Sequence, residues 1–266
     1  EAISNARERV RVLEATYVVA KNTVRQAYKD IPAADYYTAT ESGLNTAIQN
    51  LKTDITNKEG DENVKSTDDY FKDASTAGSL DAQIAAINTS ITTYQTNGEA
   101  AAAKYMEVWS AYQNGKDAVA AAKALVGNLL IYNIPTHNEG TYDYKTNIEA
   151  AETYLNTVKT ALETALTKTD DDHVTAMMAL SYDNTKETAI SARVTREKVN
   201  ADILSYMRAA YTTSQLYYEL KGIYDNTFTG NETTDKATYG ISYDNVKQAY
   251  DAITMPNYTS DQVATP

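Results

Sequence analysis

The stretch that decides the fold is residues 80–132, LDAQIAAINTSITTYQTNGEAAAAKYMEVWSAYQNGKDAVAAAKALVGNLLIY. Apolar or small residues recur in it at intervals that alternate between three and four positions, which is the pattern of one helix face in a heptad repeat. These stripe positions are Ile84, Ile87, Ile91, Tyr94, Gly98, Ala101, Tyr105, Val108, Tyr112, Gly115, Val119, Ala122, Val126 and Leu129. No proline interrupts the stretch, so the sequence predicts one helix from Leu80 to about Tyr132.

Such a helix is about 75 Å long, because each residue adds about 1.5 Å. No compact domain of this size needs a helix of that length. We therefore expect its first half to pack against one set of helices and its second half against another. Gly98 and Gly115 lie on the stripe and cost about 1 kcal/mol each relative to alanine, and we expect strong helix formers such as residues 99–104 to compensate.

Shorter stripes with the same period lie on both sides of this stretch. They predict helices over residues 1–31, 36–57, 141–169, 183–226 and 239–254. Pro32 ends the first of them. Residues 57–80 are polar and predict a long loop with a short helical piece at Asp69–Lys72, and a second loop is expected from Asp170 to about Tyr182.

The helical segments form an internal repeat of about 100–107 residues. Two dipeptides recur at this spacing: Ile31-Pro32 as Ile134-Pro135, and Tyr105-Met106 as Tyr206-Met207. Each unit has three helices, and its last helix continues into the first helix of the next unit. The predicted units are a bundle at 1–110, a bundle at 111–210 and a partial unit of two helices at 211–266. This incomplete third unit predicts that the chain is a piece of a longer array.

This organisation resembles the spectrin repeat, a left-handed three-helix bundle that shares a continuous helix with its neighbour. The resemblance rests on helix length, heptads and helix sharing, and it extends to no residue motif. Spectrin repeats usually carry a tryptophan in the middle of their first helix, whereas Trp109 lies near the predicted junction of two units. The resemblance therefore implies shape, and bacterial surface proteins also contain tandem modules of this shape. The predicted fold class is all-α, with tandem left-handed three-helix bundles joined by long continuous helices into an elongated rod.

Composition excludes several classes of protein and site. The 266 residues are 42% hydrophobic, which is typical of neither a disordered chain nor a membrane protein. The absence of cysteine excludes disulfides and thiolate metal sites, and two histidines leave almost no room for a multi-histidine metal centre. A net charge of −12 argues against nucleic-acid binding. The richness in tyrosine, with 22 Tyr against 2 Phe, and in asparagine and threonine favours an extracellular protein.

No motif in the sequence indicates catalysis or a cofactor. The acidic cluster Asp170–His173 has two interpretations, a divalent-cation site or an inter-helix loop of capping aspartates, and the second is the simpler one. Arg7, Arg9 and Arg11 are expected to form ion pairs on a helix face rather than a partner or membrane contact, and Arg196 is expected to pair with an acid or to extend from the helix seam. We therefore assign no catalytic, cofactor-binding or metal-ligating residue.

Five aromatic residues are candidates for partner binding. Tyr70 and Phe71 lie in the long loop, and loops of this length are often functional. Tyr36, Tyr142 and Tyr218 lie off the stripes or in loops, and exposed tyrosine is enriched in recognition surfaces.

The sequence favours a non-enzymatic structural or adhesion segment, a spacer or stalk of a larger cell-surface protein. The alternative is a helical binding module that recognises a protein or a glycan through an exposed face or through the loop at 57–80. Neighbouring repeats of the same chain are expected partners, whereas nucleic acid and a membrane-spanning segment are not expected. The expected location is extracellular or at the cell surface, with a cytoplasmic scaffold as the alternative.

Overall fold

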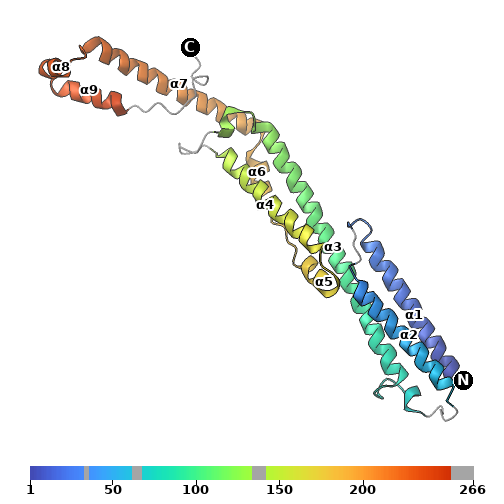
Figure 1. Ribbon diagram of the computed structural model, residues 1–266. Helices are drawn as coiled ribbons and strands as arrows, with labels where there is room; N and C mark the ends of the chain where they lie inside the picture. Colours follow the sequence, from blue (N-terminus) through green and yellow to red (C-terminus); the bar gives the residue numbers. More distant parts are fainter. Residues whose placement is uncertain (33–35, 62–67, 134–141, 253–266) are drawn as a thin grey trace. The chain divides into compact units, whose positions relative to one another are not determined.

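A computed structural model describes residues 1–32, 36–61, 68–133 and 142–252 (Figure 1). These residues contain no β-strand, which confirms the all-α prediction. The elements in order are α1 (Ala2–Ala27), α2 (Thr38–Glu59), η1 (Asp69–Phe71), α3 (Leu80–Val126), η2 (Leu130–Asn133), α4 (Tyr144–Ala165), α5 (Asp170–Met178), α6 (Thr185–Arg193), α7 (Arg196–Thr227), α8 (Glu232–Tyr239) and α9 (Ile241–Ala252). The repeated Ile134-Pro135 and part of the predicted third unit lie outside the described residues.

The chain divides into two compact units, which are described separately. The first unit comprises residues 1–120 and 148–189, and the second comprises residues 121–147 and 190–266. The bundle boundaries expected at residues 110 and 210 stay predictions.

Helix α3 runs without interruption for 47 residues, which confirms the prediction of one long helix. Every predicted stripe position from Ile91 to Val126 is buried, whereas Ile84 and Ile87 near its start are half-buried. The helix ends at Val126, some residues before the predicted end, and a short 3₁₀ helix (η2) follows. Gly127 directly follows the last helical residue, and glycine is a poor helix former.

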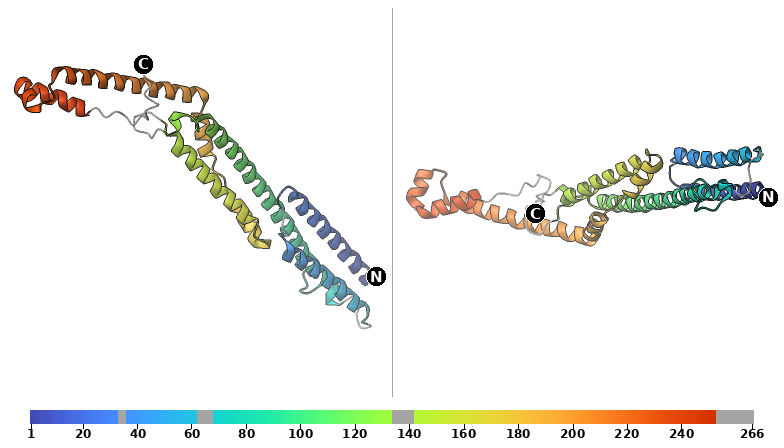
Figure 2. Two further views of the ribbon diagram at one scale, coloured as in Figure 1. Left: turned by 45° about the horizontal axis from the view of Figure 1, so that its top comes forward. Right: turned by 90° about the horizontal axis from the view of Figure 1, so that it is seen from below.

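In the first unit, α1 and α2 lie beside the N-terminal part of α3, and α4 lies beside its later part (Figures 1 and 2). The inward faces of the two shorter helices are the predicted stripes. On α1 they bury Ala6, Val10, Leu13, Tyr17, Ala20 and Val24, and on α2 Leu44, Ile48, Leu51 and Ile55. Burial of apolar area on this face stabilises the unit by roughly 25 cal/mol per Å².

The two glycines of the α3 stripe allow close approach of other side chains. A Cβ at Gly98 would lie 2.8 Å from both Cγ atoms of Val24 on α1, and a Cβ at Gly115 would overlap the hydroxyl of Tyr182. Packing therefore requires glycine at these two positions. The close contacts that it allows offset its low helix propensity, in addition to the strong helix formers nearby.

The sequence predicts an unbroken helix from residue 183, but the structure interrupts it at Val194 and Thr195, within the second unit. Thr195 is the N-cap of α7, and its Oγ1 accepts a hydrogen bond from the backbone N–H of Lys198 at 3.3 Å. The exposed Arg196 stands at the heptad position where an apolar residue would have continued the stripe. This polar residue and the preceding cap end α6 and start α7.

Candidate functional site

A buried cluster of three tyrosines and one histidine lies where α5 meets the turn between α1 and α2. Tyr28, Tyr36 and Tyr37 expose 4–7% of their surface, and His173 exposes none. The ring of Tyr36 stacks on His173 with centroids 4.1 Å apart, and the ring of Tyr37 meets it edge-on at 5.8 Å. All four residues belong to the first unit.

The hydrogen bonds of this cluster form a chain in which each group donates to the next. The Nδ1 atom of His173 lies 3.1 Å from the carbonyl oxygen of Ala165, which can only accept, so Nδ1 carries the proton. The Nε2 atom then accepts from the hydroxyl of Tyr28 at 2.9 Å. Since Tyr28 donates to the histidine, it accepts from the hydroxyl of Tyr37 at 3.1 Å. The chain of donors therefore runs from Tyr37 through Tyr28 to His173 and Ala165.

Burial shifts the pKa values of the cluster in favour of the neutral forms. It lowers the pKa of His173 below the ordinary value of 6.5 and raises the pKa of Tyr28 and of Tyr37. The histidine is thus neutral at pH 7, and both of its ring nitrogens have partners. The cluster holds α5 against α1 and α2.

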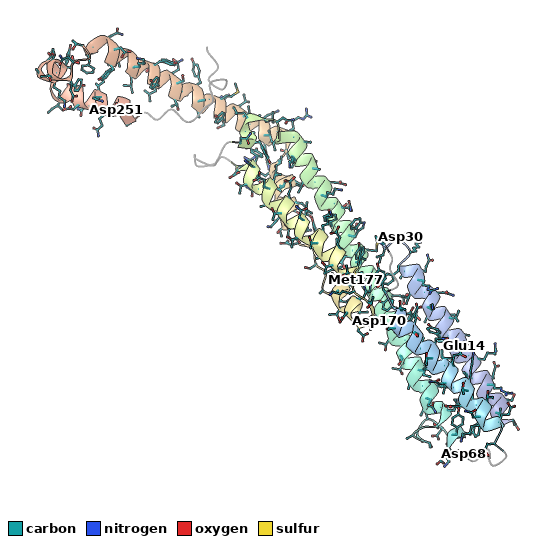
Figure 3. The ribbon with its side chains drawn as sticks, viewed as in Figure 1. Glu14, Asp30, Asp68, Asp170, Met177 and Asp251 are labelled. Carbon is teal, nitrogen blue, oxygen red and sulfur yellow. The ribbon has the colours of Figure 1, made fainter. Side chains whose placement is uncertain are left out.

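Asp170, which is labelled in Figure 3, makes a second contact between α5 and the start of α2. The residue before α2 is Tyr37, whose side chain does not cap the helix. One carboxylate oxygen of Asp170 instead accepts from the backbone N–H of Thr40 at 2.8 Å and from its hydroxyl at 2.7 Å. The backbone N–H of Asp170 donates to the carbonyl of Tyr36. A carboxylate at this place satisfies a free N–H of the helix and interacts well with its dipole.

We name the contacts of His173 and Asp170 with α1, α2 and their turn the α5 junction. Asp170 has a backbone φ of 50°, in the left-handed region that aspartate tolerates better than most residues. The sequence places the two sides of the junction about 130 residues apart. The predicted loop at Asp170 is wrong, because residues 170–178 form α5.

Beside the junction, Glu41 of α2 connects several groups. Its carboxylate pairs with Lys21 and, at 3.4 Å, with Arg25, both on α1. The hydroxyl of Tyr94 on α3 donates to Oε1 at 2.8 Å, and the hydroxyl of Tyr17 donates to the Glu41 carbonyl at 3.0 Å. This one residue therefore ties three helices of the first unit.

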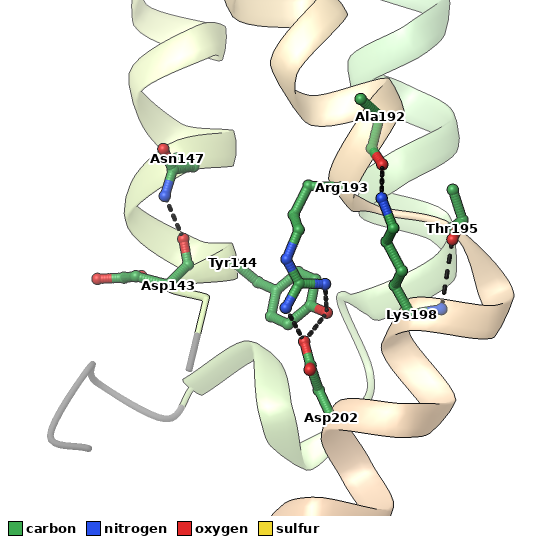
Figure 4. A network of polar contacts seen from close by, with 8 residues as sticks. All are labelled: Asp143, Tyr144, Asn147, Ala192, Arg193, Thr195, Lys198 and Asp202. Carbon is green, nitrogen blue, oxygen red and sulfur yellow. Dashed lines mark hydrogen bonds and ion pairs between the residues drawn. The ribbon is translucent and has the colours of Figure 1, made fainter. Parts of the chain in front are cut away.

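The second unit has its own polar network, which Figure 4 shows from close by. The buried Tyr144 donates from its hydroxyl to Oδ2 of Asp202 at 2.6 Å and accepts from Nη1 of Arg193 at 3.1 Å. Arg193 and Asp202 also form an ion pair. Burial and the bonded carboxylate raise the pKa of Tyr144. The network fixes the start of α4 against α6 and the first turns of α7.

The five predicted partner-binding residues occupy different environments and do not form one site. Tyr36 is 4% exposed, so the expectation that its ring is an open surface is corrected. Tyr142 is half-buried, with the Arg193 guanidinium 5.0 Å from its ring centre. Tyr70 is buried and Phe71 half-buried, with their rings edge-to-face at 5.2 Å. Tyr218 is 60% exposed on α7.

The loop that contains Tyr70 has the short helical piece that the sequence predicts, η1, whereas residues 62–67 lie outside the described residues. The Lys58 ammonium lies 5.5 Å from the centre of the Tyr70 ring. Burial raises the pKa of Tyr70 to about 12. These contacts hold the described part of the loop against the end of α2.

The arginines near the N-terminus form the expected ion pairs. Arg7 pairs with Glu59, Arg9 with Asp81, and Arg11 with Glu8 at 2.6 Å. Among the described residues, no group of three or more His, Asp or Glu side chains is arranged to hold a metal ion. No helix in the same residues has the length and hydropathy to cross a membrane.

Comparison of the chain with protein-family models, with curated proteins and with solved structures gives no match. What can be inferred about function therefore rests on the geometry of the two units.

Proposed function

We propose that the chain is a non-enzymatic structural or adhesion segment that acts as a spacer or stalk of a larger cell-surface protein. In this proposal, tandem left-handed three-helix bundles, similar in shape to spectrin repeats, share continuous helices and form an elongated rod. The proposed location is the cell surface, on grounds of composition, with a cytoplasmic scaffold as the alternative.

One observation carries the proposal: α3 is a single helix of 47 residues with partners along both its halves. At about 1.5 Å per residue this helix is about 70 Å long. The α5 junction supports the same function, because it bonds α5, which follows α4 in the chain, to the end of α1 and the start of α2, the two helices beside the first part of α3. A spacer needs such bonds, since a bare helix bends or frays.

The absence of cysteine permits a direct test by spin labelling. The substitutions Asn88→Cys and Lys116→Cys place labels at exposed positions of α3 that are 28 residues apart. An uninterrupted helix predicts a narrow distance distribution near 42 Å between the backbones, at about 1.5 Å per residue. Small-angle scattering should give a radius of gyration well above about 18 Å, the value for a compact globule of this length. A broad label distribution, or a radius near the globular value, would contradict the spacer.

A second candidate function, recognition of a protein or glycan by a helix face, is favoured by α7. Leu204, Met207, Tyr211 and Tyr218 expose 54–60% of their surface and follow a three-four spacing on one face. Exposed apolar stripes of this kind often mark interaction surfaces.

This candidate can be separated from the spacer by substituting two exposed residues. The variant Met207→Glu with Tyr218→Glu should keep its helix content, because neither side chain is buried. An array of purified proteins and glycans should then contain a ligand that binds the unmodified chain and not this variant. Equal binding by both chains would exclude α7 as the recognition surface, and the loop variant Phe71→Ser would next be compared.

A further inference from the structure

A cavity of about 730 Å³ opens on the first unit between α1 and the start of α2. Its volume is in the range of small-molecule sites, which is about 300–1,000 Å³. The described residues that line it are Tyr17, Lys21, Val24, Arg25, Tyr28, Lys29, Tyr36, Tyr37, Thr38, Glu41, Ser42 and Asn45. Neither proposed function assigns it a role.

The charge of this lining is opposite to that of the chain. Lys21, Arg25 and Lys29 follow each other at intervals of four residues on α1, so they form one row on the helix surface. Glu41 is the one acid among the described lining residues, and it pairs with Lys21 and Arg25. The lining thus has a net charge of about +2 on a chain whose net charge is −12.

The outer two cations of this row are available to a ligand. The Arg25 side chain is 63% exposed and its contact with Glu41 is long, at 3.4 Å. Lys29 is exposed, and none of the ion pairs formed by the described residues includes it. An arginine and a lysine one helical turn apart suit a carboxylate, because both donate charge-assisted hydrogen bonds to it.

The rest of the lining suits the body of a sugar. Tyr17, Tyr28, Tyr36 and Tyr37 are buried and form an aromatic floor. Ser42 and Asn45 are exposed at the edge, three residues apart on α2, and offer a hydroxyl and an amide to ligand hydroxyls. Sugar rings combine apolar C–H faces with hydroxyl edges, and so require both kinds of surface.

We propose that this cavity binds a carboxylated saccharide, whose carboxylate lies between Arg25 and Lys29 and whose ring lies over the tyrosine floor. Glu41 holds Lys21 in place, and its longer contact with Arg25, at 3.4 Å, gives way to the ligand carboxylate. The proposal does not depend on the spacer function, because a rigid segment and a surface sugar site are compatible.

The test uses the full chain and saturation-transfer NMR at low salt. Two acidic ligands distinguish the possible sources: a galacturonic acid disaccharide for uronate polymers, and sialyllactose for sialylated glycans. Lactose is the uncharged comparison, and inorganic phosphate is the comparison for charge without a sugar ring. We expect at least one acidic sugar to bind, with an affinity at least tenfold above that of lactose and of phosphate, and to weaken as salt rises. If neither acidic sugar binds, or if lactose or phosphate binds equally well, the proposal is wrong.

Variants of matched charge complete the test. Arg25→Gln with Lys29→Gln should weaken binding at least tenfold. Arg7→Gln with Arg11→Gln removes two cations with the same spacing from the same helix, away from the cavity, and should leave affinity unchanged within twofold. Asn45→Trp places a large ring at the cavity edge and should also block binding, without any change of charge. If the two double variants lost affinity equally, the effect would come from the overall charge of the chain and not from the cavity, and the proposed site would be wrong.

Discussion

Protonation of His173 should loosen the α5 junction. The imidazole is fully buried, and burial lowers its pKa from the ordinary 6.5. Backbone groups of Ala165 and Lys168 and the Asp170 carboxylate favour the charged imidazole, but burial outweighs them and the net effect is a lower pKa. A charged imidazole would also have to donate from Nε2 and so reverse the order of the tyrosine hydrogen bonds.

The size of this effect follows from linkage. Below pH 6.5 the unfolded chain binds a proton at His173 and the folded chain does not, so stability falls as pH falls. The full stability from this group is present above pH 6.5, and the loss is about 1.4 kcal/mol per pH unit down to the folded pKa. Between pH 7.5 and pH 5.5, His173 alone should therefore remove up to about 1.4 kcal/mol.

The assay is urea unfolding at a series of pH values, combined with hydrogen exchange of peptides that cover α5. The variant His173→Phe keeps a ring against Tyr36 and cannot titrate. It should be less stable at pH 7.5 by about 2–5 kcal/mol, because the Tyr28 hydroxyl and the Ala165 carbonyl lose their partner. Its stability should change less with pH than that of the unmodified chain. Both chains should carry His137→Gln, which removes the other histidine.

The reasoning would be refuted by equal pH slopes in the two chains between pH 5.5 and 7.5. It would also be refuted if hydrogen exchange in α5 did not increase as the unmodified chain is acidified.

Three further substitutions test the packing and the polar network. Gly115→Ala should cost about 1–3 kcal/mol, because the new Cβ overlaps the Tyr182 hydroxyl, and the added Tyr182→Phe should recover part of that loss in a double-mutant cycle of thermal unfolding. Gly43→Ala, whose Cβ would meet no atom within 4 Å, should instead raise stability by about 0.5–1 kcal/mol, and a fall in melting temperature would contradict this account of the glycines. Tyr144→Phe should cost about 1–3 kcal/mol in urea unfolding, since Asp202 loses a hydrogen bond of 2.6 Å inside a partly buried network, and no change would mean that water replaces the hydroxyl.

Heptad spacing was sufficient to predict the helices that pack along one face. The stripes of α1, α2 and α3 are buried at nearly every predicted position, because a 3-4 period specifies which side of a helix is apolar whatever its partner is. The interruption before α7 had a signal in the sequence, the polar Arg196 on the stripe after a threonine that caps helices well. The heptad pattern alone places this arginine in the seam of a continuous helix.

The α5 junction could not be predicted in the same way. Its bonds join residues that are far apart in the chain, and no local pattern reports which carboxylate caps a distant helix. Tyr37, the residue before α2, has a side chain that does not cap a helix, and nothing in the local sequence indicates that Asp170 takes that role. From the sequence alone the two stripe glycines carry only a cost in helix propensity, because the side chains of Val24 and Tyr182 that need the space come from other elements.

The two glycine contacts on α3 also fix the distance along the helix between the positions where Val24 and Tyr182 pack. Gly98 receives Val24 and Gly115 receives Tyr182, so the 17 residues between them set a separation of about 26 Å along the helix. One residue inserted between the two glycines would rotate Gly115 by about 100° around the helix axis, away from Tyr182. Seven inserted residues would restore the angle but move Gly115 about 10 Å further along the helix axis. The hydrogen bonds of Asp170 and His173 could not span that added distance. The interval between Gly98 and Gly115 must therefore keep its number of residues for both contacts to persist.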